Sequence, residues 1–580
     1  MRVTTRNLAD FIKAYDVRGL VPEQLDATVT RALGSAFAQV VVLPEGATSV
    51  VVGHDMRPSS PELSRAFAEG VAAHGVDVTL IGLASTDQLY FASGALGVPG
   101  AMFTASHNPA AYNGIKLCRA AARPVGQDSG LVAIRELAQA DLDAGRTPEA
   151  ADHGGPPAGQ ISERDLLTEY GTFLRLLVDL SEIRPLRVVV DAGNGMAGHT
   201  VPAVLGTGSG LDALPLDIVP LYFELDGTFP NHEANPLEPA NLVDLQRAVI
   251  GHRADIGLAF DGDADRCFVV DERGEPVSPS AVTALVATRE IAKEVAAGRE
   301  AAEVKIVHNV ITSAAVPEIV AEHGATPVRT RVGHSFIKDE MAAAGAVFGG
   351  EHSAHYYFRD FWFADTGMLA AMHVLAALGE SSVPLSELVS SYSRYAASGE
   401  INSTVTDRAS ATERALGWAQ DQGPIAIDRL DGVTVRHLGQ PTWWFNVRAS
   451  NTEPLLRLNV EAADDATMSR VRDTVLGLLR GGTAPTGDGD PVTEAVADTS
   501  LEPVADAAAE SGPALPPAIH AIEPWLREIL RCPACRGVLT DGQGPDGPEL
   551  VCTGPGCARA YRIDGGIPVL LIDEARRTQG

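Results

Sequence analysis

Lysine is scarce in this chain of 580 residues, because only five of its 45 basic residues are lysines and the others are arginines. Acidic residues number 75, so the formal net charge is −30. This charge excludes nucleic acid and anionic membranes as general partners, since both require a basic surface. It does not exclude small phosphorylated substrates, which need only a local pocket of arginines.

Long apolar runs are also missing. The first ten residues, MRVTTRNLAD, lack the apolar core of a signal peptide, and no apolar span of about 18 residues follows. The overall content of 45% hydrophobic and 21% charged residues is ordinary for a globular protein. We therefore expect a cytoplasmic protein of about four domains that does not contact membranes.

A nucleophile elbow of the form G-x-S-x-G does not occur anywhere in the chain. Its absence matters for the stretch TASHNP (104–109, the serine loop), where Ser106 stands beside His107 and suggests a hydrolase. Pro109 cannot continue a strand and constrains the turn. A serine on such a loop can instead receive a phosphoryl group and return it.

Three stretches that are present share one plan, a β-branched run that ends in Gly or Asp and precedes a helix-like segment. They are SVVVGHDMRPSS (49–60), LRVVVDAGNGMAG (186–198) and ADIGLAFDGDADR (254–266). The alternation predicts an α/β fold of three tandem mixed domains, followed by a fourth, α+β domain. The expected domains are 1–150 (serine loop), 151–255, 256–375 (metal and sugar loops, defined below) and 376–480 (phosphate loop).

Residues 481–520 have a different composition, with seven acidic residues, no Lys or Arg and several prolines. Little in this stretch can be buried in a core, so we expect a disordered acidic linker. Residues 521–580 are expected to form a separate small domain.

Two motifs suggest sites that other features do not support. GNGMAG (193–198) fits the dinucleotide pattern G-x-G-x-x-G, but no other feature of a dinucleotide site is evident, and a tight strand-to-helix turn is favoured. DGDADR (261–266, the metal loop) begins like an EF-hand loop, yet Arg266 stands where Gly is required and the flanks look like strands.

The carboxylates of the metal loop nevertheless indicate a cation site. Asp261, Asp263 and Asp265 alternate, so in an extended loop their side chains point the same way. Converging oxygen ligands suit Mg²⁺, which leaves room for a substrate phosphate. The alternative is a solvated acidic turn.

Taken together, the motifs resemble the α-D-phosphohexomutase superfamily, most closely its phosphomannomutase/phosphoglucomutase group, over about residues 7 to 475. The four motifs are TASHNP, DGDADR, GEHSAH (350–355, the sugar loop) and RASNTEPLLR (448–457, the phosphate loop), and they occur in this order. The resemblance implies that Ser106 is phosphorylated, that the three aspartates and the phosphorylated Ser106 bind Mg²⁺, and that Arg266 reaches toward the serine. It implies sugar contacts from Glu351, Ser353 and His355, and contacts to the non-reacting phosphate from Arg448, Ser450, Asn451, Thr452 and Arg457.

Smaller matches agree with this resemblance. They supply Arg18 in YDVRG, Asp55 and Arg57 in GHDMRPSS, Lys116 in NGIK as a proton-transferring base, and His334 and Lys338 in RTRVGHSFIKDEM. Lys116 suits a base only if its surroundings lower its pKa. His107, His334 and His355 have structural alternatives, and Lys338 is expected to be a charge facing the cleft rather than a catalytic group.

The reaction implied is transfer of a phosphoryl group between O6 and O1 of mannose, and of glucose, through a phosphoserine and a hexose 1,6-bisphosphate. The fold implied is four domains around a central cleft.

Two alanines depart from the family pattern, which usually has glycine at both positions. Ala354 would be strained if its φ is positive, whereas the change at Ala264 is expected to be harmless. The residue Asn451 favours the mannose/glucose group over phosphoglucosamine mutases, which remain an alternative.

Cysteine is almost absent until the C-terminal 50 residues. Cys118 and Cys267 stand alone and are expected to be buried thiols, whereas the remaining cysteines form two pairs, Cys532 with Cys535 and Cys552 with Cys557. In a cytosolic protein such spacing favours metal over disulfides, and four thiolates suit a structural Zn²⁺.

The stretch YRIDGGIPVLLIDEA (561–575) makes the C-terminal region resemble small zinc-ribbon proteins that activate methyltransferases. That resemblance implies a protein partner for residues 521–580. It leaves a second hypothesis open, in which a mutase-like body is a scaffold that presents the zinc module to a methyltransferase or to another partner.

Overall fold

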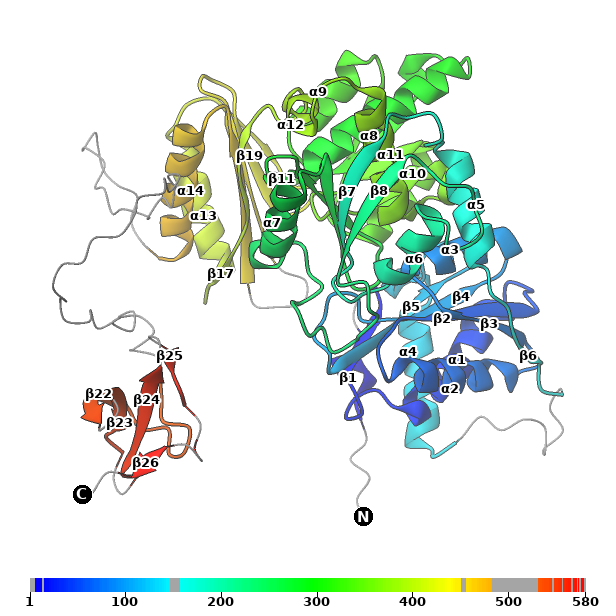
Figure 1. Ribbon diagram of the computed structural model, residues 1–580, viewed down its shortest axis with the longest axis horizontal. Coiled ribbons are helices and arrows are strands. Elements are labelled where there is room, and N and C mark those ends of the chain that lie inside the picture. The colour runs from blue at the N-terminus through cyan, green and yellow to red at the C-terminus, as the bar shows by residue number, and fades with distance from the viewer. Residues whose placement is uncertain are drawn as a thin grey trace, which may run out of the picture. The chain divides into compact units, whose positions relative to one another are not determined.

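The structure is a computed structural model, and it divides into two compact units, Met1–Gly487 and Asp488–Gly580 (Figure 1). The described residues are 6–12, 15–146, 157–449, 455–481, 530–544, 547–554, 557–564, 567–570, 572 and 575–577. The linker expected at 481–520 lies outside the described residues from 482 onward. Among the described residues, no helix has the length and apolar character needed to cross a membrane.

The first sheet of the large unit is built from the apolar runs of residues 17–163. Its strands are β1 (Val17–Leu20), β2 (Ser49–His54), β3 (Asp77–Leu83), β4 (Gly100–Phe103), β5 (Tyr112–Cys118) and β6 (Ile161–Glu163), and its helices are α1 (Ala27–Phe37), α2 (Ser60–Ala72), α3 (Thr86–Leu96) and α4 (Leu131–Asp143). The order is β1-β5-β4-β2-β3-β6, in which β2 pairs in parallel with both β3 and β4. In Figure 1, α1, α2 and α4 lie on one side of this sheet and α3 on the other.

This order places a topological switch point between β2 and β4. The chain leaves β2 toward β3 on one side and returns through α3 to β4 on the other side. The carboxyl ends of two such strands bound a crevice in which α/β proteins place ligands. Asp55 and Arg57 follow β2 at this crevice, and Ser106 follows β4.

The second sheet has the order β11-β10-β9-β7-β8. Its strands are β7 (Leu186–Asp191), β8 (Leu216–Leu221), β9 (Ile256–Phe260), β10 (Cys267–Asp271) and β11 (Pro276–Val277), and its helices are α5 (Leu167–Leu177), α6 (Ala197–Val204) and α7 (Val243–His252). The metal loop joins β9 to β10, which pair antiparallel. It therefore belongs to this sheet and not to the third domain expected from 256, because β9 pairs in parallel with β7.

The third sheet has the order β13-β12-β14-β15-β16. Its strands are β12 (Lys305–Asn309), β13 (Thr326–Thr330), β14 (Phe348–Gly350), β15 (Tyr356–Phe358) and β16 (Ala364–Asp365), and its helices are α8 (Pro279–Ala296), α9 (Ala315–Glu322), α10 (His334–Ala344), α11 (Gly367–Glu380) and α12 (Leu385–Ser390). The sugar loop connects the antiparallel strands β14 and β15.

The fourth sheet is antiparallel, with the order β17-β21-β20-β19-β18. Its strands are β17 (Ala396–Thr404), β18 (Ile425–Asp428), β19 (Val433–His437), β20 (Trp443–Ala449) and β21 (Leu455–Ala462), and α13 (Arg408–Gln420) and α14 (Asp465–Leu479) cover one face (Figure 1). Together with the three mixed sheets, this layer confirms the predicted fold class.

The small unit contains a sheet of order β22-β23-β24-β25, and β26 pairs with β24. The bounds are β22 (Leu539–Gly544), β23 (Gly547–Cys552), β24 (Arg559–Asp564), β25 (Ile567–Pro568) and β26 (Arg576–Arg577). The core formed by its described residues is small, because Leu539, Leu550 and Tyr561 are the main buried side chains there besides cysteine. In the large unit, one core runs through the second and third sheets and takes in α3, and a separate core underlies the first sheet.

Candidate active site and cysteine cluster

Ser106 lies where the serine loop meets the metal loop. Its hydroxyl donates to Asp261 Oδ2 at 2.9 Å, and Arg266 Nη2 donates to Ser106 Oγ at 3.5 Å. The side chain is nearly buried, and its φ of 50° is in a region that residues other than glycine rarely adopt. Such backbone strain persists where the surroundings enforce it, and it is common at functional sites.

Arg57 holds the backbone of the serine loop in this conformation. Its guanidinium donates to the carbonyl oxygens of Ser106 at 2.9 Å and of Asn108 at 2.7 Å. Asp55 holds the guanidinium through an ion pair of 3.2 Å, and both side chains are fully buried. Arg57 therefore acts on the backbone of the serine loop, and its donors do not face a ligand. Arg18 contributes from β1 by donating to Asn108 Oδ1 at 2.6 Å.

His107 lies between the serine and Arg266. Its Nδ1 accepts from Arg266 Nη2 at 2.6 Å and lies 3.3 Å from Ser106 Oγ. Burial, together with the positive charges of Arg266 and Arg18, holds the pKa of His107 well below its ordinary value. The imidazole is therefore neutral, and it orients Arg266 beside the serine hydroxyl.

The metal loop brings three carboxylates together in a buried space. Asp261, Asp263 and Asp265 offer oxygens within 4.8 Å of one another, and each side chain is at most 2% exposed. Lys116 and Arg266 form ion pairs with these carboxylates and offset part of their negative charge. Among the described residues, Oδ1 of Asp263 and of Asp265 have no hydrogen-bond partner. Buried oxygens of this kind fit the preferred ligands of a divalent cation.

Lys116 contacts the same carboxylates from β5. Its Nζ lies 2.6 Å from Asp263 Oδ2 and 2.5 Å from Asp265 Oδ2. Burial by itself would lower the pKa of Lys116, but the two carboxylates outweigh burial and raise it above the ordinary value. This differs from the lowered pKa that a lysine base requires, because the aspartates stabilise its charged form.

Two alanines near the site adopt the left-handed conformation. Ala354 in the sugar loop has a φ of 63°, and this positive φ means that the alanine is strained. Ala264 in the metal loop, where the change from glycine was expected to be harmless, has a φ of 60° and therefore meets the same condition for strain. A residue with a Cβ costs roughly 1–2 kcal/mol in this region, because the Cβ approaches the following carbonyl oxygen.

The sugar loop holds Glu351 in a fixed position. Its Oε1 accepts from Asn309 Nδ2 and from the backbone of Gly333, both at 3.1 Å, and its Oε2 accepts from Tyr357 OH at 2.8 Å. Ser353 Oγ lies 3.0 Å from His355 Nδ1, and the other ring nitrogen of His355 lies 3.8 Å from Asp265 Oδ1. The loop thus adjoins the metal loop.

Lys338, which the sequence predicts to be a charge facing the cleft, is buried, with 3% of its side chain exposed. Its Nζ forms an ion pair with Asp365 at 2.6 Å and lies 4.1 Å from the ring centroid of Tyr90. The ring and the carboxylate replace its hydration. His334 begins α10, and its side chain lies outside the described residues.

The phosphate loop is described at its two ends only. Arg448 on β20 and Arg457 on β21 stand directly opposite each other, and Glu400 on β17 pairs with both, at 2.5 and 3.0 Å. Two like charges in this position repel, and the carboxylate offsets their repulsion. Ser450, Asn451 and Thr452 lie outside the described residues.

Three supporting residues were missed by the sequence analysis. Thr86 donates its hydroxyl to Asp263 Oδ2 at 2.6 Å, Asn309 holds Glu351, and Glu400 joins the two arginines. For Thr86 the sequence contains a signal for the start of α3 only, because Ser85 and Gln88 in STDQ have the spacing of a helix cap. The other two act across strands that are distant in sequence.

The GNGMAG turn packs against the backbone of the metal loop. It leaves β7 and enters α6, with Gly193 at φ 52° and Met196 donating to Gly262 O at 2.9 Å. A Cβ on Gly195 would lie 2.7 Å from that same oxygen. Glycine is therefore required for close backbone approach, as the sequence favoured, rather than for a dinucleotide.

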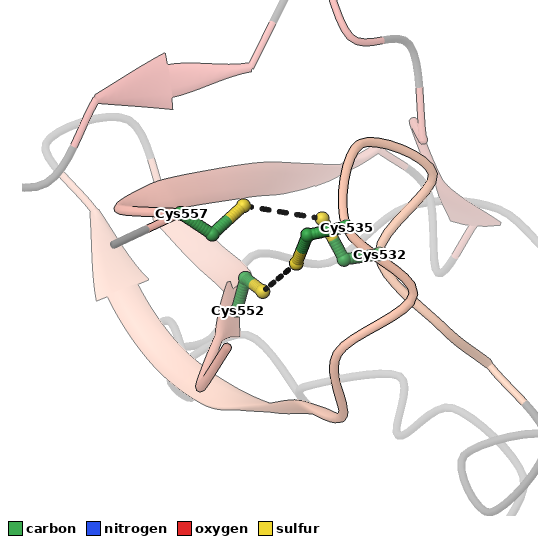
Figure 2. A group of neighbouring side chains, drawn as sticks. All are labelled: Cys532, Cys535, Cys552 and Cys557. Atoms are coloured by element: carbon green, nitrogen blue, oxygen red, sulfur yellow. Dashed lines mark hydrogen bonds between the residues drawn. The ribbon is translucent and has the colours of Figure 1, made fainter. Parts of the chain in front are cut away.

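The four C-terminal cysteines form one cluster in the small unit. Figure 2 shows their sulfur atoms facing one another, with Cys532 Sγ 3.6 Å from Cys557 Sγ and Cys535 Sγ 3.3 Å from Cys552 Sγ. Four sulfurs around one zinc at about 2.3 Å would lie about 3.8 Å apart. A disulfide would require about 2 Å, and all four thiols are free. Cys118 and Cys267 are buried thiols, as expected.

Three groups donate to these sulfurs. The backbone of Gly554 donates to Cys552 Sγ at 3.3 Å, Tyr561 OH lies 3.1 Å from Cys532 Sγ, and Arg559 Nη1 donates to Cys557 Sγ at 3.8 Å. Donors around sulfur stabilise thiolates, which are the form that binds metal. The residues present therefore fit a closed tetrathiolate zinc site.

Comparison with known families gives four consecutive matches to domains of one family. The matches are Phosphoglucomutase/phosphomannomutase, alpha/beta/alpha domain I at 10–142, domain II at 168–274, domain III at 279–395 and the C-terminal domain at 400–478. Domain II contains the metal loop, in agreement with the second sheet.

Individual relatives agree with these matches. The chain is 41% identical over 472 residues to a protein named phosphohexose mutases from Xanthomonas campestris pv. campestris, covering 81% of this chain and 99% of that protein. It is 37% identical to a phosphomannomutase of Escherichia coli strain K12, covering 80% and 98%. A phosphoglucomutase/phosphomannomutase family structure from Burkholderia thailandensis superimposes with a TM-score of 0.70 at 29% identity, covering 82% and 99%. The chain belongs to the phosphoglucomutase/phosphomannomutase family and is a phosphohexomutase.

Proposed function

We propose that this phosphohexomutase moves a phosphoryl group between O6 and O1 of mannose phosphate, and of glucose phosphate, through phosphorylated Ser106. The observation that carries the proposal is the position of Ser106 Oγ, 2.9 Å from Asp261 and 3.5 Å from Arg266. A carboxylate and a guanidinium beside one buried hydroxyl suit covalent storage of a phosphoryl group.

The proposed exchange consists of two transfers. In the first, the bond between phosphorus and Ser106 Oγ breaks while phosphorus bonds to the free sugar hydroxyl, whose proton passes to a base, and a hexose 1,6-bisphosphate forms. The bisphosphate turns end for end, and its other phosphoryl group returns to Ser106 Oγ. Added hexose 1,6-bisphosphate therefore acts as the activator that supplies phosphorylated enzyme.

The residues of the site have separate proposed roles. Asp261, Asp263 and Asp265 hold Mg²⁺, which neutralises charge on the transferring group when bound. Arg266 contacts the phosphoryl oxygens, and Lys116 is the proposed base once its ion pairs with the aspartates are released. Glu351 and Ser353 contact sugar hydroxyls, with His355 beside them. Arg448 and Arg457 bind the distant phosphate after exchanging Glu400 for it, together with Ser450, Asn451 and Thr452.

The test is a Mg²⁺-dependent assay with mannose 1-phosphate and glucose 1-phosphate, primed with hexose bisphosphate. Ser106→Ala is expected to lower kcat at least about 1000-fold. Mass spectrometry should find phosphate on the peptide that contains Ser106 in the native enzyme alone. Ser390→Ala, at an exposed position at the end of α12, is the matched control. Equal turnover of the native enzyme and the Ser106 variant would refute the proposal, and preferred turnover of glucosamine 1-phosphate would assign the alternative substrate.

We also propose that the small unit holds a structural Zn²⁺ on its four cysteines. Sulfur separations of 3.3 and 3.6 Å, with three donors around them, support this site. Elemental analysis of the purified full-length protein should find about one zinc per chain, and none after Cys552→Ser. Absence of zinc from the native protein would refute it. The proposed protein partner of this unit is tested separately, by capture with the full chain before and after a chelator.

A further inference from the structure

The first turn of α3 lies where three sheets of the large unit meet. Thr86 contacts the metal loop twice, because its backbone N–H donates to Asp263 O at 3.0 Å and its hydroxyl donates to Asp263 Oδ2 at 2.6 Å. Thr86 is fully buried. The orientation of Asp263 therefore depends on where the start of α3 lies.

Asp87, the next residue, joins that turn to two other parts of the chain. Its Oδ2 accepts from Tyr170 OH on α5 and from Thr366 Oγ1 at the start of α11, each at 2.7 Å. The hydroxyl of Ser85 donates to its other oxygen. One carboxylate thus links α3 of the first sheet, α5 of the second and α11 of the third.

The start of α11 contacts the metal loop at a different point. A Cβ on Gly367 would lie 2.6 Å from the carbonyl carbon of Arg266, so the helix begins directly against the backbone of that arginine. Asp365, two residues earlier, offers an oxygen within 4.8 Å of Asp265 and His355. Through Thr366, Asp87 therefore also fixes the second support of the metal loop.

Burial of the Asp87 carboxylate in this position lowers the stability of the fold. It is 1% exposed, and its hydrogen-bond partners are three neutral hydroxyls. Burial raises the pKa of Asp87 to about 6 although all three hydroxyls oppose the shift. The positive ends of two helices, α3 and α11, give partial compensation. A buried carboxylate without a cation costs stability, and such a cost is typical of residues kept for function.

We propose that Asp87 is a positioning residue, which holds the starts of α3 and α11 together and thereby sets the orientation of the metal loop toward a divalent cation. It touches neither the substrate nor the reacting atoms. The inference rests on the proposed cation site at the three aspartates. It adds the residue that aligns this site across three sheets.

The test measures Mn²⁺ binding by electron paramagnetic resonance with the full-length protein, so that its readout does not depend on turnover. Asp87→Ala should weaken Mn²⁺ affinity about 10- to 100-fold, as loss of groups behind metal ligands does. Asp87→Asn keeps an oxygen that can accept from Tyr170 and Thr366, and it should stay within about threefold of the native protein. The KM for the sugar phosphate should change less than the Mn²⁺ affinity.

Glu290→Ala is the matched control, because Glu290 is a buried carboxylate of α8 that contacts Lys293 and His373 instead of the metal loop. It should lower thermal stability and leave Mn²⁺ affinity unchanged. The proposal is overturned if Asp87→Ala binds Mn²⁺ as the native protein does while Asp263→Asn does not. If the native protein itself binds no Mn²⁺, the proposed cation site fails as well.

Discussion

The molecule contains two clusters of candidate metal ligands, and they are built in opposite ways. The cysteine cluster takes its four sulfurs and three donors from residues 532–561. The aspartate cluster takes its ligands from one loop, but its partners Ser106, Lys116 and Thr86 come from positions about 150 to 180 residues earlier. The first is a local construction, and the second depends on how the sheets meet.

This difference indicates how far the fold of each unit depends on its cluster. Among the described residues of the small unit, few apolar side chains are buried, so we expect its fold to depend on a metal held by the cysteines. The large unit has extended cores, so it can hold three aspartates in a buried space without a metal to maintain the fold. Metal removal should therefore unfold one region and inactivate the other.

The largest expected effect is loss of the small unit in Cys552→Ser. Structural zinc supplies roughly 10 kcal/mol or more of apparent folding free energy, so residues 530–577 should unfold and become sensitive to protease. Mutase activity should stay within about twofold, because the large unit has its own cores. Limited proteolysis and the activity assay on the same sample check this. Cys118→Ala is the control, and an intact small unit in the zinc-free variant would contradict the prediction.

Asp263→Asn should have the reverse effect. Turnover should fall about 100- to 1000-fold, because one charged ligand is lost and Lys116 loses one of two carboxylate partners. The zinc content of the small unit should not change. Steady-state kinetics and elemental analysis measure the two quantities. A variant with native turnover would show that the aspartates do not serve the reaction.

Acid should lower the stability of the large unit through a buried histidine. His308 on β12 is 4% exposed, and burial lowers its pKa to about 4. Between pH 6.5 and 4 the unfolded chain binds a proton that the folded chain does not, so the stability of the large unit falls as the pH is lowered through this window and is independent of His308 above it. The slope is at most about 1.4 kcal/mol per pH unit.

His308→Asn removes this titration. Its unfolding free energy should therefore depend less on pH between 6.5 and 4 than that of the native protein, with equal slopes above pH 7. Chemical denaturation at several pH values measures this. Identical slopes in the acid window would exclude His308 as a source of acid sensitivity.

The smallest expected effect concerns the left-handed alanines. Ala354→Gly and Ala264→Gly should each stabilise the large unit by about 0.5–1 kcal/mol, because relief of strain exceeds the entropic cost of glycine. Ala140→Gly, at an exposed position within α4, should instead destabilise by about 1 kcal/mol. Melting temperatures compare the three, and a destabilised Ala354→Gly would indicate that packing of its methyl group outweighs strain.

The alternating apolar runs were sufficient to predict the layered α/β architecture, and the fourth domain was predicted as α+β without its antiparallel strand order. The domain boundary predicted at 255 was wrong. From local sequence, β9 and β10 could belong to either the second or the third domain, and only the pairing of β9 with β7 assigns them to the second. The resemblance supplied Lys338 as a charge facing the cleft, but it did not identify the groups that contact it. Its ion pair with Asp365 and the ring of Tyr90 are not visible from local sequence.

The sequence by itself determined the two sets of candidate ligands, because spacing within a short segment fixes which side chains can converge. It placed Asp261, Asp263 and Asp265 on one loop and paired the four cysteines. Tertiary structure decided what those groups contact. It set Ser106 against Asp261, put Arg57 under the serine loop and joined three sheets at Asp87. Contacts across such distances in sequence form only when the sheets pack, since no local propensity specifies them.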